Sequence, residues 1–358
     1  MLPKPTKWLI AISLLIMFIC ALLIGMASSS ANRRITEATP PLHFPLRGLP
    51  PIRGFCMQLC LPGHLKAYER SIRNLRAMGC RWINFVVNAR QKGLTAVHLS
   101  MDHKKSLSAP DILRVLAFAH SLHIKTMLMP IVLLDHATGS EWRGAIKPRS
   151  WPMWFAGYRR YILRAARWAQ AGHVRIFSVG SELLTSESHK RQWMRIVAAV
   201  RRLFHGKLTY SSNWDHYQDV RIWPELNYVG MNSYYDLGKR AHKPVGQIMA
   251  TWRPIQRNML AFARRMHKPL LITETGWDNL QNTLEKPWDY VGTGRIEPGV
   301  QARAYEAYIR VWRRLPPREF AGVFFWEWWP GVKPTHYGAY SLQAEPALPL
   351  VEHWISGK

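Results

Sequence analysis

The feature of this chain that most restricts its fold is a regular alternation of short apolar runs with amphipathic segments, which begins at residue 54. The runs are too short for core helices and are bounded by turn residues, and several are rich in β-branched or aromatic residues, so they are predicted to be strands. There are eight of them: GFCMQLC from 54, RWINFVV from 81, KTMLMPIV from 125, RIFSVGSEL from 175, KLTYSSNW from 207, NYVGMNSYY from 227, LLITETGW from 270 and GVFFWEWW from 322.

The segments between the runs have the periodicity of helices. Ser108, followed three residues later by Asp111, resembles a capping box, and residues 153–170, 190–204 and 301–314 also have helical spacing. Alternating strands and helices predict right-handed parallel crossovers. Eight such units over about 300 residues are what a closed (β/α)8 barrel, or TIM barrel, requires. An open doubly wound sheet is the competing arrangement, but no Gly-rich phosphate loop follows the first run.

The N-terminus contains a long apolar run at residues 8–27, WLIAISLLIMFICALLIGMA, which is long enough to cross a bilayer. Typical cleaved signal peptides have about 7–15 apolar residues, which favours an uncleaved transmembrane signal anchor, although small residues after the run also fit cleavage. The predicted domains are a signal anchor or signal peptide at 1–27, a linker at 28–53 and the barrel at 54–358. We expect the barrel to be anchored in the inner membrane and to face the periplasm or exterior, or to be secreted if the segment is cleaved.

The chain is strongly basic, with 49 Lys and Arg against 22 Asp and Glu and a formal net charge of +27. Such a charge favours an anionic partner, for example an acidic glycan, lipid head groups or nucleic acid. The basic residues are nevertheless dispersed as pairs on helix-like segments, such as Arg159-Arg160 and Arg264-Arg265. This pattern is typical of solvated helix faces, so we expect no nucleic-acid partner.

The cysteines and histidines do not form a recognisable metal or disulfide pattern. Cys56, Cys60 and Cys80 are an odd set outside the N-terminal run, and we interpret them as small buried residues, with a single disulfide as the open alternative. Histidines near the ends of the runs, among them His136 and His216, lack the paired-ligand spacing of zinc sites. We therefore expect no metal and no cofactor.

Two acidic residues lie at the ends of predicted strands: Glu182 in SVGSELL and Glu274 in ITETGW. In a TIM barrel, chemistry is concentrated at the carboxyl ends of the strands, and strand alternation lets both side chains point inward. Two carboxylates about 5–5.5 Å apart are the arrangement of a retaining glycosidase. The alternatives are structural: Glu182 could pair with an Arg at a helix start, and Glu274 could be a helix N-terminal charge or part of a buried ion pair.

Aromatic residues accompany the same strand ends. Trp326, Trp277, Trp214, Tyr234 and Tyr235 all lie at or just beyond a predicted strand. The flat faces of sugar rings pack well on aromatic rings, so each is a candidate for substrate contact. For each of them, packing in the core is the alternative.

Two polar residues are further candidates for substrate binding. Asn213 could bind a sugar or form a local Asx turn with Asp215. Arg143 could reach a substrate hydroxyl or pair with Asp135. Glu327 lies between two tryptophans, and strand alternation predicts that it faces away from them, so it is left out of the predicted site.

The order of these motifs resembles glycoside hydrolase family 113, the β-mannanase-type barrels of clan A, over about residues 54–330. The resemblance is carried by MPIVLLDHATGSEWRGAIKP, WPMWFAGY, FSVGSELL, LTYSSNWD, YVGMNSYYDL, LLITETGW and FFWEWWP. It implies that Glu182 is the acid/base and Glu274 the nucleophile of a covalent mechanism, and that Tyr234 or Tyr235 donates a hydrogen bond to Glu274. The sequence departs from clan A at Ser181, where most members have Asn and family 113 is expected to have Thr.

The resulting hypothesis is a retaining glycoside hydrolase that cleaves a β-linked polysaccharide, either mannan-like or an exported and possibly anionic exopolysaccharide. The alternative is a catalytically inactive barrel that binds polysaccharide in an envelope assembly, and transglycosylation would use the same two carboxylates. Met129 and Ile131 stand where more polar subsite residues are expected, which bears on the identity of the sugar. We expect a monomer.

Overall fold

The computed structural model describes residues 48–138, 141–289, 292, 294–331 and 340–357. They belong to a unit that spans residues 41–358. The predicted membrane segment at 8–27 and most of the predicted linker lie outside the described residues. Within the described part of the chain, none of the helices combines the length and the apolar character needed to cross a bilayer.

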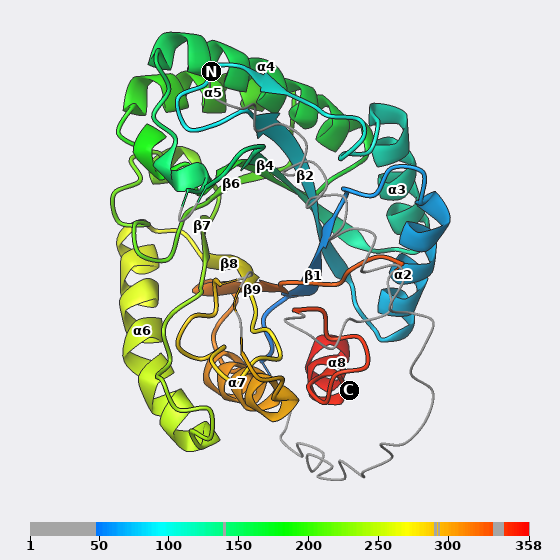
Figure 1. Ribbon diagram of the computed structural model, residues 1–358, viewed down its shortest axis with the longest axis vertical. Coiled ribbons are helices and arrows are strands. Elements are labelled where there is room, and N and C mark those ends of the chain that lie inside the picture. Colours follow the sequence, from blue (N-terminus) through cyan, green and yellow to red (C-terminus); the bar gives the residue numbers. More distant parts are fainter. Residues whose placement is uncertain (1–47, 139–140, 290–291, 293, 332–339, 358) are drawn as a thin grey trace, which may run out of the picture. The chain divides into compact units, whose positions relative to one another are not determined.

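Eight parallel strands form a ring with helices around it (Figure 1). In chain order they are β1 (Ile52–Gln58), β2 (Trp82–Gln91), β4 (Lys125–Leu134), β5 (Ile176–Ser181), β6 (Lys207–Ser211), β7 (Val229–Asn232), β8 (Leu270–Thr275) and β9 (Phe320–Phe325). Around the ring the order is β6-β5-β4-β2-β1-β9-β8-β7, and a parallel bridge between Ser212 and Met231 joins the two ends of this series. The predicted TIM barrel with its eight strands is confirmed. A short ninth strand, β3 (Leu99–Ser100), pairs antiparallel with β2.

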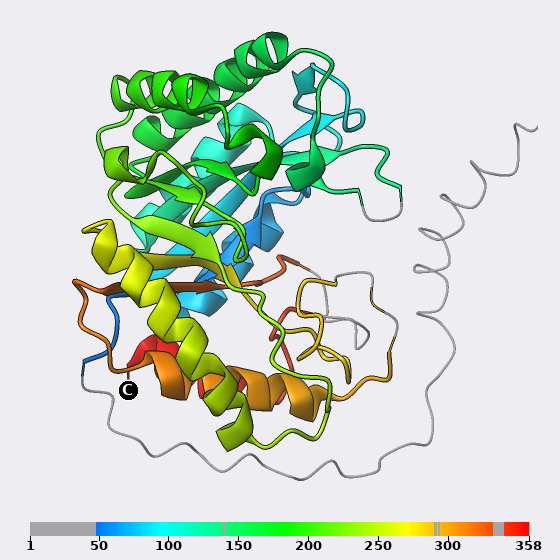
Figure 2. The same cartoon turned by 90° about the vertical axis from the view of Figure 1, so that its left-hand side faces the viewer.

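The helices lie outside the ring in both views (Figures 1 and 2). They are α2 (Leu65–Ala77), α3 (Ala109–Ser121), α4 (Trp151–Ala171), α5 (Lys190–Arg201), α6 (Val245–Arg265), α7 (Pro298–Trp312) and α8 (Leu348–Ser356). The predicted cap of α3 is present, since the Ser108 side chain accepts a hydrogen bond from the Asp111 N–H at 3.3 Å.

One crossover departs from the predicted strand–helix alternation. Between β6 and β7, all of whose connecting residues are described, the chain forms only the 3-10 helix η3 (Trp223–Glu225). Trp223 is buried, and its indole N–H donates to the Tyr217 carbonyl at 2.8 Å. A large side chain with a satisfied donor therefore covers this part of the barrel in place of a full helix.

The interior of the barrel is filled by apolar side chains that alternate along the strands with side chains facing the helices. Met129 and Ile131 belong to this interior cluster, together with Cys56, Val86 and Phe324. The two positions where polar subsite residues were expected are therefore part of the barrel core. Burying an aliphatic side chain of this size contributes roughly 1.5–3 kcal/mol to the free energy of unfolding.

A polar layer lies above the apolar interior and just below the end of β8. The Ser211 and Thr273 hydroxyls are 2.6 Å apart, and the Asn84 side chain donates to the Thr273 carbonyl at 3.2 Å. All three residues are buried. These hydrogen bonds fix the backbone that precedes Glu274.

Gly276 allows the loop after β8 to approach the end of β9. A Cβ atom at this position would lie 2.1 Å from the Trp326 carbonyl oxygen, which is far inside any allowed contact. The Trp326 N–H also donates to the Thr275 carbonyl at 2.7 Å. The glycine in the ITETGW motif therefore has a packing reason, because it brings the ends of two strands together next to the site.

Candidate active site

Glu182 and Glu274 lie at the carboxyl ends of β5 and β8, where the sequence predicted them. Both side chains are nearly buried, with 6% and 5% of the residue surface exposed. The charge on Glu182 raises the pKa of Glu274, so the two carboxyl groups interact across the mouth of the barrel. The ring closure thus brings together two residues that are far apart in the sequence.

Glu182 is held by donors on two other segments of the mouth. The Asn232 side-chain amide donates to one carboxylate oxygen, and the Arg143 guanidinium forms an ion pair with the other. The Glu182 backbone has a φ of +51°, a left-handed conformation that is uncommon for a non-glycine residue. Its N–H still donates to the Ser211 carbonyl at 2.8 Å, so the pairing with β6 continues past the end of β5.

The ion pair between Arg143 and Glu182 excludes the pairing of Arg143 with Asp135 that the sequence left open. Asp135 pairs with Arg90 and with Lys105 rather than with Arg143. Glu182 does have an arginine partner, but this arginine begins the 3-10 helix η1 (Arg143–Ala145) in the loop after β4 and does not belong to the segment that follows Glu182. The arginine therefore lies inside the site and not on its edge.

Glu274 is buried and receives a hydrogen bond from the Tyr234 hydroxyl. Burial raises the pKa of Glu274 most, the charge on Glu182 raises it further, and Arg143 and a hydrogen bond from Tyr234 lower it. Burial disfavours the charged form of a carboxyl group, whereas a cation or a donor favours it. The hydrogen bond comes from Tyr234, as one of the two sequence alternatives predicted, and not from Tyr235.

Tyr235 instead supports an aromatic wall beside the site. Its hydroxyl donates to the Trp214 carbonyl at 3.0 Å, and the two rings are 4.8 Å apart. Trp214 is stacked on Trp288, with ring centroids 5.9 Å apart and an interplanar angle of 29°. Trp288 is 45% exposed and was not among the predicted residues. The wall therefore presents an accessible ring that the sequence analysis missed.

Asn232 is a second residue that the sequence analysis missed. It is completely buried at the end of β7, and besides Glu182 its amide donates to the Asn213 side chain at 2.9 Å. Its oxygen accepts from the Trp214 N–H at 2.9 Å. The signal was available, because an asparagine ends the apolar run VGMN at the face where the active site of a TIM barrel forms.

Asn213 forms the local turn that was one of its two predicted alternatives. Its side-chain amide donates to Asp215 at 2.7 Å, as expected for a local turn. Its side-chain oxygen accepts from Asn232, which in turn donates to Glu182. Asn213 is thus connected to the acidic pair through Asn232.

Of the two tryptophans predicted as sugar platforms after β8 and β9, Trp277 and Trp326, only Trp326 is accessible. Trp277 is 1% exposed and packs against Trp252 and Tyr305 in the layer between the sheet and the helices. A buried indole offers no face to a sugar, so the prediction of Trp277 as a substrate-binding residue is wrong. Trp326 is partly exposed and contacts the interior cluster of the barrel, which leaves it as the candidate platform at this edge.

Glu327 belongs to the site, contrary to the alternation argument. It accepts a hydrogen bond from Gln58 at 2.9 Å, and its charge raises the pKa of Glu274. Burial raises the pKa of Glu327 itself to about 7. Strand alternation fails here because β9 ends at Phe325, two residues earlier. The peptide bond between Trp326 and Glu327 is cis.

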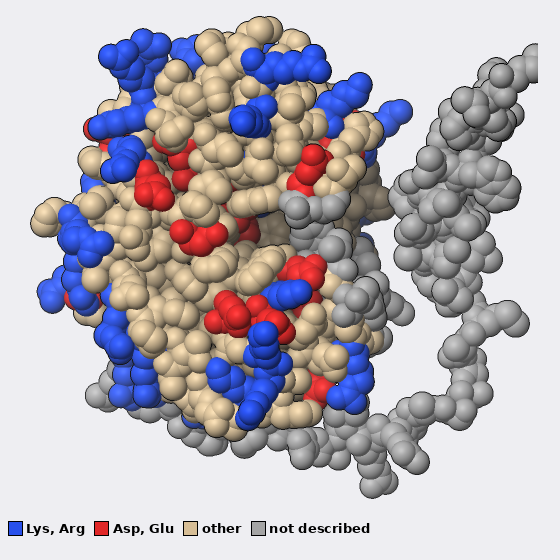
Figure 3. All heavy atoms as spheres, turned by 60° about the vertical axis from the view of Figure 1, so that its left-hand side comes forward, with Lys and Arg blue, Asp and Glu red and all other residues tan. Residues whose placement is uncertain are grey.

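The charged residues are distributed unevenly over the surface. On the face drawn in Figure 3, Lys and Arg lie mostly around the outer part, whereas Asp and Glu gather between them. The pairs named from the sequence lie on helices, with Arg159 and Arg160 exposed on α4 and Arg264 and Arg265 exposed on α6. Among the described residues, no three His, Cys, Asp or Glu side chains are grouped so that they could hold a metal ion. Cys56, Cys60 and Cys80 are free thiols.

A TIM barrel with two buried, interacting glutamates at its mouth and aromatic rings beside them defines a glycosidase of the two-carboxylate class. The profile of Glycoside Hydrolase Family 113 matches residues 64–341. The chain therefore belongs to glycoside hydrolase family 113, and it is a retaining O-glycosyl hydrolase.

Solved structures agree with this assignment. The family 113 β-mannanase AaManA from Alicyclobacillus acidocaldarius, in complex with ManMIm, is 26% identical, with a TM-score of 0.76 over 86% of this chain and 97% of that one. A family 113 β-1,4-mannanase has 19% identity and a TM-score of 0.77 over 87% and 100% of the two chains. A family 5 mannosidase from Rhizomucor miehei shares the fold, with 10% identity and a TM-score of 0.57 over 87% and 93%. A search of curated protein sequences gives no match.

Proposed function

We propose that this protein hydrolyses a β-linked mannan with retention of anomeric configuration, with Glu182 as the acid/base and Glu274 as the nucleophile. The observation that carries the proposal is the pair of buried glutamates whose charges interact across the barrel mouth. The substrate class is supported by the two similar family 113 structures, both of which are β-mannanases.

In the first step, Glu182 gives its proton to the glycosidic oxygen while a Glu274 oxygen attacks the anomeric carbon. The bond between the anomeric carbon and the leaving oxygen breaks, and a covalent glycosyl-enzyme ester forms. In the second step, the ionised Glu182 takes a proton from water, whose oxygen displaces Glu274 from the anomeric carbon. Two inversions at the same carbon give net retention, and the free pair is restored.

In the substrate-free site, the contacts of the two glutamates favour a charge on Glu182 and a proton on Glu274. Arg143 and Asn232 both interact favourably with a negative charge on Glu182, whereas burial raises the pKa of Glu274. The first step requires the opposite distribution, with the proton on Glu182 and the charge on Glu274. In the proposed cycle, a substrate hydroxyl takes the place of Glu182 as the partner of the Arg143 guanidinium, and the proton passes from Glu274 to Glu182, which leaves the charge on Glu274. Tyr234 meanwhile stabilises the charge on Glu274.

Aromatic residues on two sides of the mouth provide the sugar platforms of the proposal. Trp326 is the platform beside β9, and Trp214, Trp288 and Tyr235 form the wall beside β6 and β7. Trp288 is the most exposed of these rings. We assign it to a sugar unit farther from the cleaved bond, because it lies on the outer face of the stack.

The location of this protein and its monomeric state are further parts of the proposal. The apolar run at residues 8–27 predicts attachment to a membrane, with the barrel on the outer side, and the net charge of +27 predicts attraction to an anionic polymer. If an acidic polymer is the natural substrate, activity on it should fall steeply as salt is raised, because screening weakens long-range attraction. Activity on neutral mannan should change little.

The function is tested by incubating residues 36–358 with β-mannan, β-glucan and acidic exopolysaccharides and measuring new reducing ends. NMR of the first anomer released from the active polymer reports retention or inversion. The expected result is release from β-mannan with retention. Inverted product would contradict the proposed roles, and binding without release on every polymer would favour the inactive barrel.

A further inference from the structure

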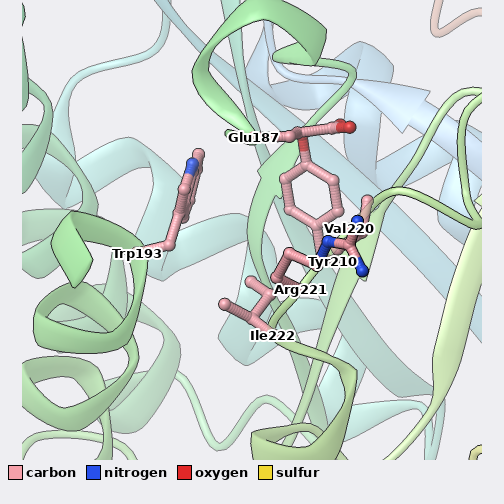
Figure 4. Close-up of a pocket in the computed structure, with 6 residues that line it drawn as sticks. All are labelled: Glu187, Trp193, Tyr210, Val220, Arg221 and Ile222. Carbon is pink, nitrogen blue, oxygen red and sulfur yellow. The ribbon is translucent and has the colours of Figure 1, made fainter. Parts of the chain in front are cut away.

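A buried acid–tyrosine pair lies directly behind Glu182, outside the contacts used by the proposed mechanism. Glu187 and Tyr210 come from the turn after β5 and from β6, and they are 6% and 0% exposed. The Tyr210 hydroxyl donates to a Glu187 carboxylate oxygen at 2.7 Å. Figure 4 shows the tyrosine ring rising toward the glutamate, in a pocket that Trp193 and Ile222 also line.

The same hydroxyl accepts a hydrogen bond from the peptide that follows Glu182. The Leu183 N–H donates to the Tyr210 oxygen at 2.9 Å. The Leu183 carbonyl is held as well, because it accepts from the Ser186 N–H at 2.9 Å and from the Ser186 hydroxyl at 2.6 Å. Both sides of Leu183 are therefore fixed by hydrogen bonds in a completely buried environment.

These contacts replace strand pairing where it ends. The Glu182 N–H still pairs with β6, but the next N–H, that of Leu183, is bound by a side chain. Glu182 itself has the left-handed φ of +51°, a conformation that persists only when its surroundings impose it. A group that binds the next N–H selects that conformation and thereby aims the Glu182 side chain.

We propose that Tyr210, oriented by Glu187, is a positioning residue that holds the backbone of Glu182 so that its carboxyl group faces the mouth of the barrel. The inference rests on the proposed role of Glu182 as the acid/base. Glu187 sets the direction of the hydroxyl, because an oxygen that donates to Glu187 keeps its lone pairs free for the Leu183 N–H. Neither residue touches substrate.

The charged and titratable groups around Glu187 come from several segments. Besides Tyr210 they are Asp215 and Asp219 in the loop after β6, Glu182, and Arg221, which lines the pocket. Burial raises the pKa of Glu187 to about 8, and the three acids raise it while Tyr210 lowers it. At neutral pH Glu187 is thus mostly protonated, so its orienting effect on Tyr210 does not require a charge.

The test uses two β-mannotriosides that differ in their leaving group, an alkyl alcohol and dinitrophenolate. Only the alcohol needs a proton from Glu182 in the first step, so a fault in Glu182 selectively lowers kcat/KM of the alkyl substrate, because kcat/KM reports the first step. Tyr210→Phe should lower kcat/KM on the alkyl substrate at least about ten-fold more than on the dinitrophenyl substrate. Glu187→Leu should change the ratio in the same direction by a smaller factor. Glu187→Gln retains an acceptor for the tyrosine and should restore the wild-type ratio.

Tyr158→Phe is the matched control. Tyr158 is also completely buried and packs on Trp193 at 5.5 Å, as Tyr210 does at 5.4 Å, but its hydroxyl donates to the Val179 carbonyl, upstream of Glu182. It should leave the ratio of the two rates unchanged. The proposal is overturned if Tyr210→Phe and Glu187→Leu keep the wild-type ratio or lower both rates equally. If Glu182→Gln also shows no dependence on the leaving group, the proposed role of Glu182 is what fails.

Discussion

The two glutamates of the site are surrounded by different kinds of neighbour. Glu182 has a guanidinium and an amide in direct contact and a rigid backbone turn, whereas Glu274 is buried near two other carboxyl groups, whose effect Arg143 and the Tyr234 hydroxyl oppose. Donors and cations stabilise a charge in place, while burial favours the neutral form. The difference indicates that the site controls its two carboxyl groups by different means, Glu182 through a direct ion pair and hydrogen bond and Glu274 mainly through burial.

The largest effect should come from removing either carboxylate. Glu274→Gln removes the nucleophile and should lower kcat by about four orders of magnitude or more on every substrate. Glu182→Gln should lower kcat/KM by roughly two to four orders on poor leaving groups and much less on dinitrophenolate, because kcat/KM reports the first step alone. Steady-state rates on both substrates check this contrast. Equal losses for the two variants on both substrates would mean that the roles are not divided as proposed.

Removing one hydrogen-bond donor from each glutamate should give the same difference in leaving-group dependence, with smaller losses of activity. Asn232→Ala and Tyr234→Phe each remove a donor to one carboxyl group and should lower kcat/KM by about ten- to a hundred-fold. The loss in Asn232→Ala should depend on the leaving group, and that in Tyr234→Phe should not. Thermal unfolding of both variants serves as the control for folding. The reverse pattern of leaving-group dependence would contradict the assignment.

The charge of Arg143 should appear in the pH dependence of activity. Arg143 lowers the pKa of Glu274, so its removal raises that pKa. The nucleophile must be ionised, and the acidic limb of the kcat/KM profile in Arg143→Ala should therefore move to higher pH by about one unit. Arg90→Ala, which removes the partner of Asp135 instead, is the control. An acidic limb that stays in place or moves down would show that Arg143 does not act on the pair.

The last prediction concerns Glu187 and the pH dependence of the free energy of unfolding. Burial raises the folded pKa of Glu187 from 4.5 to about 8, so folding favours the protonated form. The stabilisation is complete below the unfolded pKa and is lost as pH rises through the folded value, with a slope of up to about 1.4 kcal/mol per pH unit. Glu187→Gln should therefore lose less stability than the wild type between about pH 5 and pH 8. The free energy of unfolding of both proteins is measured with urea across this pH range. Parallel curves of this free energy against pH would contradict the raised pKa of Glu187.

Local sequence patterns were sufficient for the framework of the fold. Each strand was visible as a short apolar run, and the Ser108 cap of α3 followed from a side chain and a backbone N–H three residues apart. The positions of Glu182 and Glu274 followed from the same rule, since both end an apolar run. The fully described connection between β6 and β7 has no α-helix, and its 3-10 helix η3 contains the buried Trp223.

Errors arose at residues just beyond the strand ends. Trp277 was assigned to the site because it is an aromatic residue at a strand end, and Glu327 was left out by strand alternation, which says nothing about side chains after the last strand residue. Trp277 turned out to be buried against α6 and α7, and Glu327 turned out to interact with Glu274. A tryptophan next to a strand end can therefore lie at the barrel mouth or in the layer between the sheet and the helices, and tertiary packing determines which.

The amino-acid sequence by itself determined the eight strands of the ring, their parallel arrangement and the two carboxylates at their ends, because these depend on residue type and on spacings of a few residues. Closure of the ring decided the rest. It placed Arg143 and Asn232 on Glu182, and Tyr234 on Glu274, across sequence separations that no local period encodes. The physical reason is that hydrogen bonds, ion pairs and loss of water depend on distances between segments, and those distances exist only after the barrel has formed.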